Sequence, residues 1–588
     1  MASELFTPVL RRLEDLIMEI ENGKLGLPEL QRGYVWKATK VRDLLDSMFK
    51  GYPIGYLMIW NPRDSLEKSK QIGTDDKDFS TPRSLVIDGQ QRLTSLYAVI
   101  NGEEIVDDEF NKKFIIISFN PLTREFEVGD NAKKRATDWI YNISEVFKNK
   151  SNSFNYITNK VQTIADDRKK CGTVLGDYDR QLIQQNITDL LSLGRFNVPT
   201  FEINGNADEE SVAHIFVRVN SGGKALGQDD FILTLISVYW QEGRKKIEDF
   251  CRNSKIPKEK SAYNYLFQPS AAHIVRIAMC FGFKRAKLYY AYRMLRGRDF
   301  GNDVDSDELR IERFDTLKSI IDKILNVQVW KDFLKCIMAA GFVSKALISS
   351  ENAIVYSYCM YLIGKYEYNM DESSLRKMIS KWFFMTATTG YYTGSPETDM
   401  ESDLADLRAV KTADAFESLL ESKIAAILTN DYFEITLPDN LENSASRNPS
   451  WFGYCAALNI LDAKVLFSKL RTRELFDPTA DGTRKALERH HLFPKAYLSK
   501  IGITEDRERN QQGNYAFIEW TDNIEILDTS PAEYMKKKLA EIPANERDAI
   551  YADHALPDNW EHMDYHEFLR QRRALMAKVV RRGYERLK

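Results

Sequence analysis

The run Asp88-Gly89-Gln90-Gln91-Arg92 combines residue types that suit the binding of a phosphate. Gly89 lets a ligand approach the backbone, and Arg92 can grip a phosphate with two parallel hydrogen bonds. Asp88 can hold a metal or a water molecule. The competing interpretation is that Asp88 only caps a helix and that Arg92 pairs with an acid on the surface.

A second set of residues near the end of the chain could cleave a phosphodiester. His490 and His491 are followed by Asn514, 23 residues after His491, and by Asn523, nine residues further on. Cleavage needs a water nucleophile, a base that takes its proton and a cation that neutralises the developing charge. An imidazole titrates near neutral pH and suits the base. The alternative is that one or both histidines are packed and structural, because neighbours on a strand point to opposite faces.

The elements around the first run predict a strand followed by a helix. Residues 84–87 are apolar and β-branched, and residues 93–100 continue with helical spacing. Such a turn leaves backbone N–H groups unpaired at the positive end of the helix dipole, which favours an anion. Further strands are expected at 56–60 and 113–119, and helices at 41–49 and 228–239.

Around the second set, we expect a strand that ends at the histidines and a second strand at 515–520. Ser530, Pro531 and Glu533 supply a cap, a first-turn proline and a capping-box glutamate, so a helix should begin there. Asn523 then lies before that helix, although a ligand on or beside the helix would fit the chemistry better.

Length and composition indicate several domains. A chain of 588 residues is too long to fold around a single hydrophobic core. No run of apolar residues approaches the roughly 18 that a membrane span needs. Six scattered cysteines without a C-x-x-C pair, and the lack of a signal pattern, indicate a cytoplasmic protein with reduced thiols. The net charge of −4 means that any contact with DNA must come from local patches.

The periodicity changes along the chain and predicts an α+β multidomain fold. Residues 1–239 mix strands and helices, residues 240–445 are mostly helical, and residues 446–588 contain the histidines. The second boundary is placed in the loop 438–449, which is rich in Asn, Ser and Pro. A turn-rich break at residues 390–398 interrupts the helical region and carries no chemistry that we can name.

Three motifs in order give a family resemblance. Residues 88–92 are similar to the signature of the ParB-like α/β domain that begins the GmrSD family of modification-dependent (type IV) restriction enzymes. Residues 28–36 resemble its P-x-x-Q-R-x-Y-x-W motif, and residues 216–226 resemble F-x-R-x-N-x-x-G-x-x-L. Residues 390–398 also resemble a Y-x-G-S-x-E-T motif of that family.

The resemblance implies that residues 1–239 bind and hydrolyse a nucleotide such as ATP or GTP. Asp88 and Arg92 would be catalytic in this hydrolysis. The nucleotide-binding residues would be Gln31, Arg32, Asp88, Gly89, Gln90, Gln91, Arg92 and Asn220.

The C-terminal set resembles the HNH, or ββα-metal, nuclease motif. By that resemblance His491 is the catalytic base, His490 and Asn523 bind one divalent ion, and Asn514 pins the loop between two strands. The family often has an acid where His490 stands. A neutral imidazole holds Mg²⁺ less well than a carboxylate does and suits Mn²⁺, Ni²⁺ or Zn²⁺ better, so the identity of the metal stays open.

Two basic stretches offer contacts to DNA. Residues 567–588 contain eight Lys or Arg against two Glu, and residues 276–299 contain seven against one acid, interleaved with tyrosines. Cations neutralise phosphates and aromatic rings stack on bases. We favour DNA contact for the first stretch and leave the second undecided, because a solvated basic helix face is the alternative for both.

The leading hypothesis is an NTP-regulated, metal-dependent DNA endonuclease that nicks or cuts modified or foreign DNA in defence against phage. Its partners would be double-stranded DNA and a nucleotide, without a membrane, and a homo-oligomer is compatible with the sequence. The alternative is a nucleotide-gated protein that binds DNA or senses its modification and has an inactive nuclease site.

Overall fold

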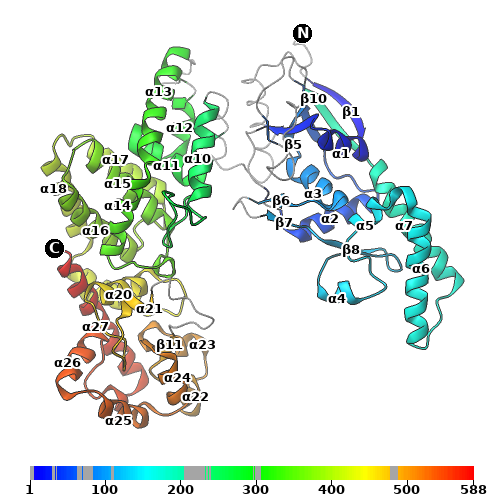
Figure 1. Cartoon of the computed structure of the whole chain (residues 1–588). Coiled ribbons are helices and arrows are strands. Elements are labelled where there is room, and N and C mark those ends of the chain that lie inside the picture. The colour runs from blue at the N-terminus through cyan, green and yellow to red at the C-terminus, as the bar shows by residue number, and fades with distance from the viewer. Residues whose placement is uncertain are drawn as a thin grey trace. The chain divides into compact units, whose positions relative to one another are not determined.

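The computed structural model describes residues 6–28, 34, 36–61, 69–70, 84–107, 112–203, 232–233, 236, 240–295, 297, 306–476 and 488–588. The chain forms two compact units, Met1–Arg244 and Lys245–Lys588 (Figure 1). Mixed sheets and many helices confirm the expected α+β composition. Most of the predicted helix at 228–239 and all of the motif at 216–226 lie outside the described residues.

The first unit is built on a mixed six-stranded sheet. Its strands lie in the order β1 (Phe6–Arg12), β10 (Asn197–Ile203), β3 (Leu57–Trp60), β5 (Ser84–Asp88), β2 (Leu25–Pro28) and β4 (Ser69–Lys70). Two small antiparallel ladders join β6 (Ile105–Val106) to β7 (Lys112–Lys113), and β8 (Ile117–Asn120) to β9 (Glu125–Val128). The single strand predicted at 113–119 is therefore two strands, and only its ends pair.

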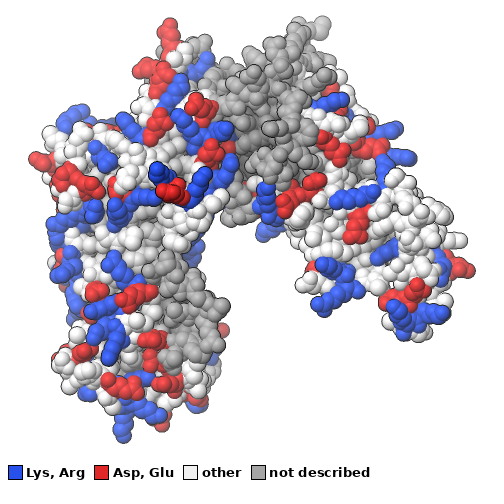
Figure 2. All heavy atoms as spheres, in the orientation of Figure 1, with Lys and Arg blue, Asp and Glu red and all other residues white. Residues whose placement is uncertain are grey.

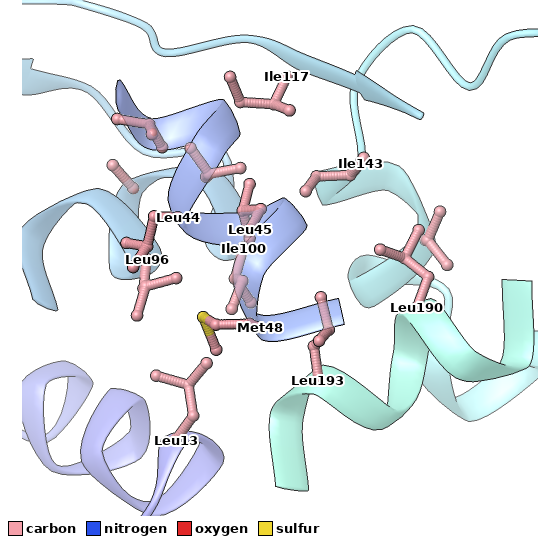
Figure 3. Packing of buried hydrophobic residues seen from close by; sticks show 14 of the residues in the cluster. Leu13, Leu44, Leu45, Met48, Leu96, Ile100, Ile117, Ile143, Leu190 and Leu193 are labelled. Atoms are coloured by element: carbon pink, nitrogen blue, oxygen red, sulfur yellow. The ribbon is translucent and has the colours of Figure 1, made fainter. Parts of the chain in front are cut away.

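All but one of the helices of the first unit pack apolar sides into one core; the exception, α4, has no buried residue. They are α1 (Leu13–Glu21), α2 (Ala38–Phe49), α3 (Gln90–Asn101), α4 (Asn131–Arg135), α5 (Ser144–Lys148), α6 (Ser153–Lys170) and α7 (Asp177–Ser192). In α2 the buried residues are Val41, Leu44, Leu45 and Met48, which is the spacing of one helix face. Figure 3 shows Leu44, Leu45 and Met48 meeting side chains from other elements. This core fixes the start of α3, where the first motif lies.

The second unit begins with a helical region. Its helices are α10 (Gln241–Asn253), α11 (Ala271–Phe283), α12 (Leu288–Leu295), α13 (Asp307–Ile324), α14 (Val327–Ala339), α15 (Glu351–Tyr366), α16 (Glu372–Thr389), α17 (Pro396–Leu407), α18 (Ala413–Ile427), α19 (Leu437–Asn440) and α20 (Pro449–Ile460). Helices α15 and α16 are buried on nearly all sides, so they form the centre of this region. Helix α20 packs against α16 and α27, and the predicted boundary at 445/446 therefore falls inside one compact unit.

The end of the second unit carries a short hairpin among helices. Strand β11 (Glu488–His491) pairs antiparallel with β12 (Tyr515–Ile518). The helices here are α21 (Thr472–Leu475), α22 (Lys495–Lys500), α23 (Asp506–Arg509), α24 (Trp520–Ile526), α25 (Pro531–Glu541), α26 (Ala544–Asp553) and α27 (Tyr565–Arg586). Ser530 and Glu533 form the expected capping box, which confirms the helix predicted there. A cluster around Leu492, Phe493 and Trp560 holds the hairpin against α25 and α27.

All six cysteines are described and are free thiols, and five of them are buried. None of the described helices is long and apolar enough to cross a membrane. On the face shown in Figure 2, acidic and basic side chains are interspersed over the described surface of each unit.

Candidate nuclease and phosphate sites

The hairpin and the following helix bring the C-terminal residues together. His490 and His491 end β11, and Asn514 directly precedes β12. Asn523 lies within α24, which follows β12 after one residue. Asn523 therefore lies before α25, as expected, but on a separate short helix that the sequence analysis did not predict.

The His490 side chain is buried and faces Asn523. Its Nδ1 lies 2.9 Å from Asn523 Oδ1. This contact is a hydrogen bond, and because an amide oxygen only accepts, His490 carries its proton on Nδ1. Burial lowers the pKa of His490 to about 4, which keeps the ring neutral and able to coordinate. The buried Nε2 therefore keeps a lone pair and has no hydrogen-bond partner among the described residues, so it is the nitrogen that could coordinate an ion.

These donors fit a borderline divalent ion better than Mg²⁺, because an imidazole and an amide carry no charge. Within the described chain, no three His, Cys, Asp or Glu side chains gather as a metal site. His490 and Asn523 supply two ligands, and phosphate oxygens and water would have to complete the coordination.

The His491 ring is held by Asn510 and Tyr515. Its Nε2 lies 3.2 Å from Asn510 Oδ1, which also accepts a hydrogen bond of 3.2 Å from the Tyr515 hydroxyl. The rings of His491 and Tyr515 contact each other with centroids 4.7 Å apart. Because an amide oxygen only accepts, His491 carries its proton on Nε2, and Nδ1 keeps a lone pair. Burial lowers the pKa of His491 to about 4, so the ring is neutral at physiological pH.

Asn514 is fully buried and joins the two halves of the hairpin connection. Its side chain accepts a hydrogen bond from the Phe493 N–H at 2.8 Å and donates to the Phe493 carbonyl at 3.0 Å and to the Arg509 carbonyl at 3.2 Å. Next to it, the buried Arg572 donates to the Gly513 carbonyl at 2.7 Å. These bonds fix the loop that carries Asn510.

Helix α25 supports the other side of the site. The Tyr534 hydroxyl donates to the Leu492 carbonyl at 2.7 Å, and its ring lies 6.0 Å from that of His490. Lys538 is buried and forms an ion pair of 2.6 Å with Asp522, next to Asn523. Tyr534, Lys538 and Asn510 were not found from the sequence, because each acts from outside the motif.

Most basic side chains of the C-terminal helix α27 have hydrogen-bond or ion-pair partners within the protein. In α27, Arg570, Arg573, Arg581 and Arg582 each form an ion pair with an acid of the same unit. Arg572 is fully buried. These pairs are mostly exposed and weak, so contact of this helix with DNA stays a prediction.

The turn-rich break at 390–398 and the central basic stretch meet. Glu397, which belongs to the break, pairs with Arg276 at 2.5 Å. Tyr391 and Tyr392 donate to the buried Asp403, at 3.1 and 2.7 Å. These contacts give the break a structural role in the helical region.

The first motif occupies the predicted strand-to-helix turn. β5 ends at Asp88, and α3 starts at Gln90. Gly89 between them has φ 89°, and an added Cβ would lie 2.3 Å from Leu57 Cδ2. Only glycine fits this turn without strain.

The Arg92 guanidinium contacts the preceding loop. It donates to the Ile54 carbonyl at 2.8 Å and to the Tyr56 carbonyl at 2.7 Å, and lies 3.5 Å from the Asp88 carboxylate. A Cβ on Gly55 would lie 2.0 Å from Arg92 Nη1. Arg92 thus has an anchoring role that the sequence did not reveal, and a phosphate would have to use its remaining N–H groups.

Tyr34 links two of the sequence motifs. Its hydroxyl lies 2.7 Å from Ser95 Oγ, which donates to the Gln91 carbonyl at 2.6 Å. Burial raises the pKa of Tyr34 to about 12, so it stays protonated. The predicted binding residues Gln31, Arg32 and Asn220 lie outside the described residues.

Comparison with known proteins agrees with this arrangement. Residues 13–237 match the family model of the GmrSD restriction endonuclease, N-terminal domain. The chain therefore carries the N-terminal domain of the GmrSD family, as expected from its motifs. An uncharacterized protein of Methanocaldococcus jannaschii (MJ0686) is 22% identical over 562 residues, which cover 91% of this chain and 88% of that protein. The similarity spans both units, so the relative combines both on one chain.

Proposed function

We propose that the protein is a metal-dependent DNA endonuclease, regulated by an NTP and acting in the cytoplasm against modified or foreign DNA. The restriction endonuclease family of its N-terminal domain supports a nuclease that acts on DNA. One observation carries the assignment of the site: His490 and Asn523 meet at 2.9 Å on a ββα element that also holds His491.

In this proposal His491 takes a proton from water at Nδ1, since Asn510 holds the proton on Nε2. The water oxygen forms a bond to phosphorus, and the bond to one ester oxygen breaks as that oxygen takes a proton from solvent. A divalent ion held by His490 and Asn523 would neutralise the charge on the phosphate. Asn514 keeps β11 and its connection in place.

The first test is plasmid nicking with Mg²⁺, Mn²⁺, Ni²⁺ and Zn²⁺. His491→Ala should slow cleavage by about 100-fold or more, because general-base catalysis contributes that much. His566→Ala is the matched control, since His566 is exposed on α27 and should not affect the rate. Cleavage by His491→Ala at the parental rate would refute the site.

The alternative is a nucleotide-gated DNA sensor with an inactive nuclease site. The uncharged pair of His490 and Asn523 favours it, because the described residues hold no group of three His, Cys, Asp or Glu side chains that could bind a metal. DNA binding without cleavage in any of the four metals would support this alternative.

For the first unit we propose that Asp88 and Arg92 bind an NTP such as ATP or GTP at the start of α3. The N–H groups of that helix end support an anion there. Phosphate release should vanish in Asp88→Ala. If release is unchanged in that variant, nucleotide hydrolysis takes place elsewhere. Digestion of unmodified, methylated, glucosylated and phosphorothioated DNA would identify the modification.

A further inference from the structure

A cavity of about 780 Å³ opens in the second unit, away from the hairpin residues. It lies between α25, α26, the loop 555–561 and α27. Cavities of roughly 300–1,000 Å³ are typical of sites for small molecules. Neither the sequence motifs nor the proposed nuclease site accounts for this one.

Three cations line the cavity, together with the acids Asp548, Asp558 and Glu561. Arg547 and Arg582 are fixed by protein acceptors: Arg547 donates to the Leu539 carbonyl at 2.6 Å, and Arg582 pairs with Asp553 at 3.0 Å. Lys578 lines the same cavity and is exposed, and it has no ion pair with any described residue. Arginines that protein acceptors hold in place, next to a lysine without an ion pair, are suited to an anion such as phosphate.

The cavity also offers acceptors and an aromatic ring. Glu561 lines the cavity, and its Oε2 is buried without a hydrogen-bond partner among the described residues. A buried carboxylate oxygen needs a donor. A ligand N–H can provide it only if the Glu561 side chain turns toward the cavity, because Oε2 has almost no accessible surface. Tyr551 is half-buried and lines the cavity together with the aliphatic side chains of Leu575 and Val579. A planar ring fits such a surface.

The backbone at the rim is unusual. Ala555 has φ 54° and Asn559 has φ 53°, and both line the cavity. Residues other than glycine rarely adopt this left-handed conformation, and they cluster at ligand-binding segments.

We propose that this cavity binds a nucleotide. Its phosphate contacts Lys578 and the two arginines, its base packs on Tyr551, and an amino group of the base donates to Glu561. A carboxylate accepts well from the amino group of cytosine, so a cytosine nucleotide fits best. The same chemistry is offered by a free nucleotide and by one turned out of DNA.

The cavity also adjoins residues of α25 and of the loop 555–561 that pack against the hairpin of β11 and β12. Leu539 and Tyr534 both belong to α25, and Leu539 lines the cavity while Tyr534 contacts the Leu492 carbonyl. Trp560, between two cavity residues in the chain, packs on Phe493 with ring centroids 5.8 Å apart. A bound nucleotide would therefore stabilise elements that hold the histidines.

Calorimetric titration of the full chain with the four deoxynucleoside 5′-monophosphates tests the proposal. We expect dCMP to bind about tenfold more tightly than dTMP, and Glu561→Gln to remove this preference. Lys578→Ala should weaken all four about tenfold. Arg570→Ala is the control, because Arg570 is exposed on the same helix but does not line the cavity.

Asp88→Ala separates this site from the one proposed in the first unit, and it should leave dCMP binding unchanged. Duplex DNA added to the dCMP complex identifies the source: displacement indicates a nucleotide turned out of DNA, and retention indicates a free nucleotide. The proposal is overturned if none of the four nucleotides binds saturably. It is also overturned if binding survives both Lys578→Ala and Glu561→Gln, or is lost in Asp88→Ala.

Discussion

His490 Nδ1 lies 2.9 Å from Asn523 Oδ1, although the two residues are 33 positions apart in the chain. The contact depends on the pairing of β11 with β12 and on the short helix α24 that follows directly. The ion pair of Lys538 with Asp522 ties α24 to α25 and so keeps Asn523 turned toward the histidine. Because both side chains are uncharged, replacing His490 by a carboxylate should change which divalent ion the site prefers.

His490→Asp should shift the metal preference toward Mg²⁺. A carboxylate is a harder and charged ligand, so the ratio of cleavage rates in Mg²⁺ and Mn²⁺ should rise about tenfold. The measurement is plasmid nicking over a range of concentrations of each metal. Asn523→Ala serves as a comparison and should weaken cleavage with every metal. An unchanged order of metals in His490→Asp would argue against coordination by this residue.

Asn510→Ala should slow cleavage, because it disturbs the orientation of His491, the proposed base, without removing that residue. Without the Oδ1 acceptor, the His491 proton is free to move to Nδ1, and the rate constant kcat should fall about tenfold while KM for DNA changes little. Asn510→Asp retains the acceptor and adds charge, so it should raise the pKa of His491 and move the acid limb of the rate profile to higher pH. Equal pH profiles for the parent and Asn510→Asp would contradict this role.

The rate of cleavage should stay high in mild acid. Burial lowers the pKa of both His490 and His491 to about 4, below the usual value near 6.5. The neutral rings therefore persist from pH 7 down to about pH 5, and activity falls only as pH approaches 4. Rates at saturating metal between pH 4 and 8 check this. A midpoint near 6.5 would show that the base is solvated in the active complex.

Folding stability should change in the same pH window, and it should fall with falling pH, as it does for a paired carboxylate whose pKa is lowered. The unfolded chain binds protons on His490 and His554 near pH 6.5, whereas burial lowers their pKa in the folded chain to about 4. The free energy of unfolding of the second unit is therefore unaffected above pH 7 and falls as pH drops from 6.5 to 4. Each histidine contributes at most about 1.4 kcal/mol per pH unit. Urea unfolding at several pH values measures this slope, and His554→Gln should reduce it.

Much of the local structure could be predicted, because it depends on short-range signals. The strand before Asp88 and the helix at Ser530 follow from periodicity and from a cap with its proline. The short helix α24, which carries Asn523, was not predicted because it has seven residues and no side-chain cap. The strand predicted at 113–119 failed because only its two ends find a pairing partner.

The supporting residues could not be predicted, since they come from distant parts of the chain. Arg572 reaches the Gly513 carbonyl across 59 positions, and Tyr34 reaches Ser95 across 61. Acids from distant segments, Glu442 and Asp553, pair with Arg573 and Arg582 of the basic helix α27, and contact of this helix with DNA stays a prediction. Tertiary contacts of this kind leave no local pattern in the sequence.

Arg92→Ala should destabilise the first unit as well as weaken nucleotide binding. The guanidinium donates to the Ile54 and Tyr56 carbonyls and is only 21% exposed, so its loss should cost about 2–3 kcal/mol. Arg124→Ala is the matched control, because its ion pair with Asp189 is exposed and should contribute less than about 1 kcal/mol.

Nucleotide binding and thermal unfolding of the same variants separate the two roles of Arg92. Asp88→Asn should weaken nucleotide binding while unfolding stays close to that of the parent, because the Asp88 carboxylate is 3.5 Å from the guanidinium and holds it only weakly. If Arg92→Ala unfolds like the parent and still loses the nucleotide, then the guanidinium serves the ligand alone. If it unfolds early but binds normally when folded, its contacts with the carbonyls are its whole function.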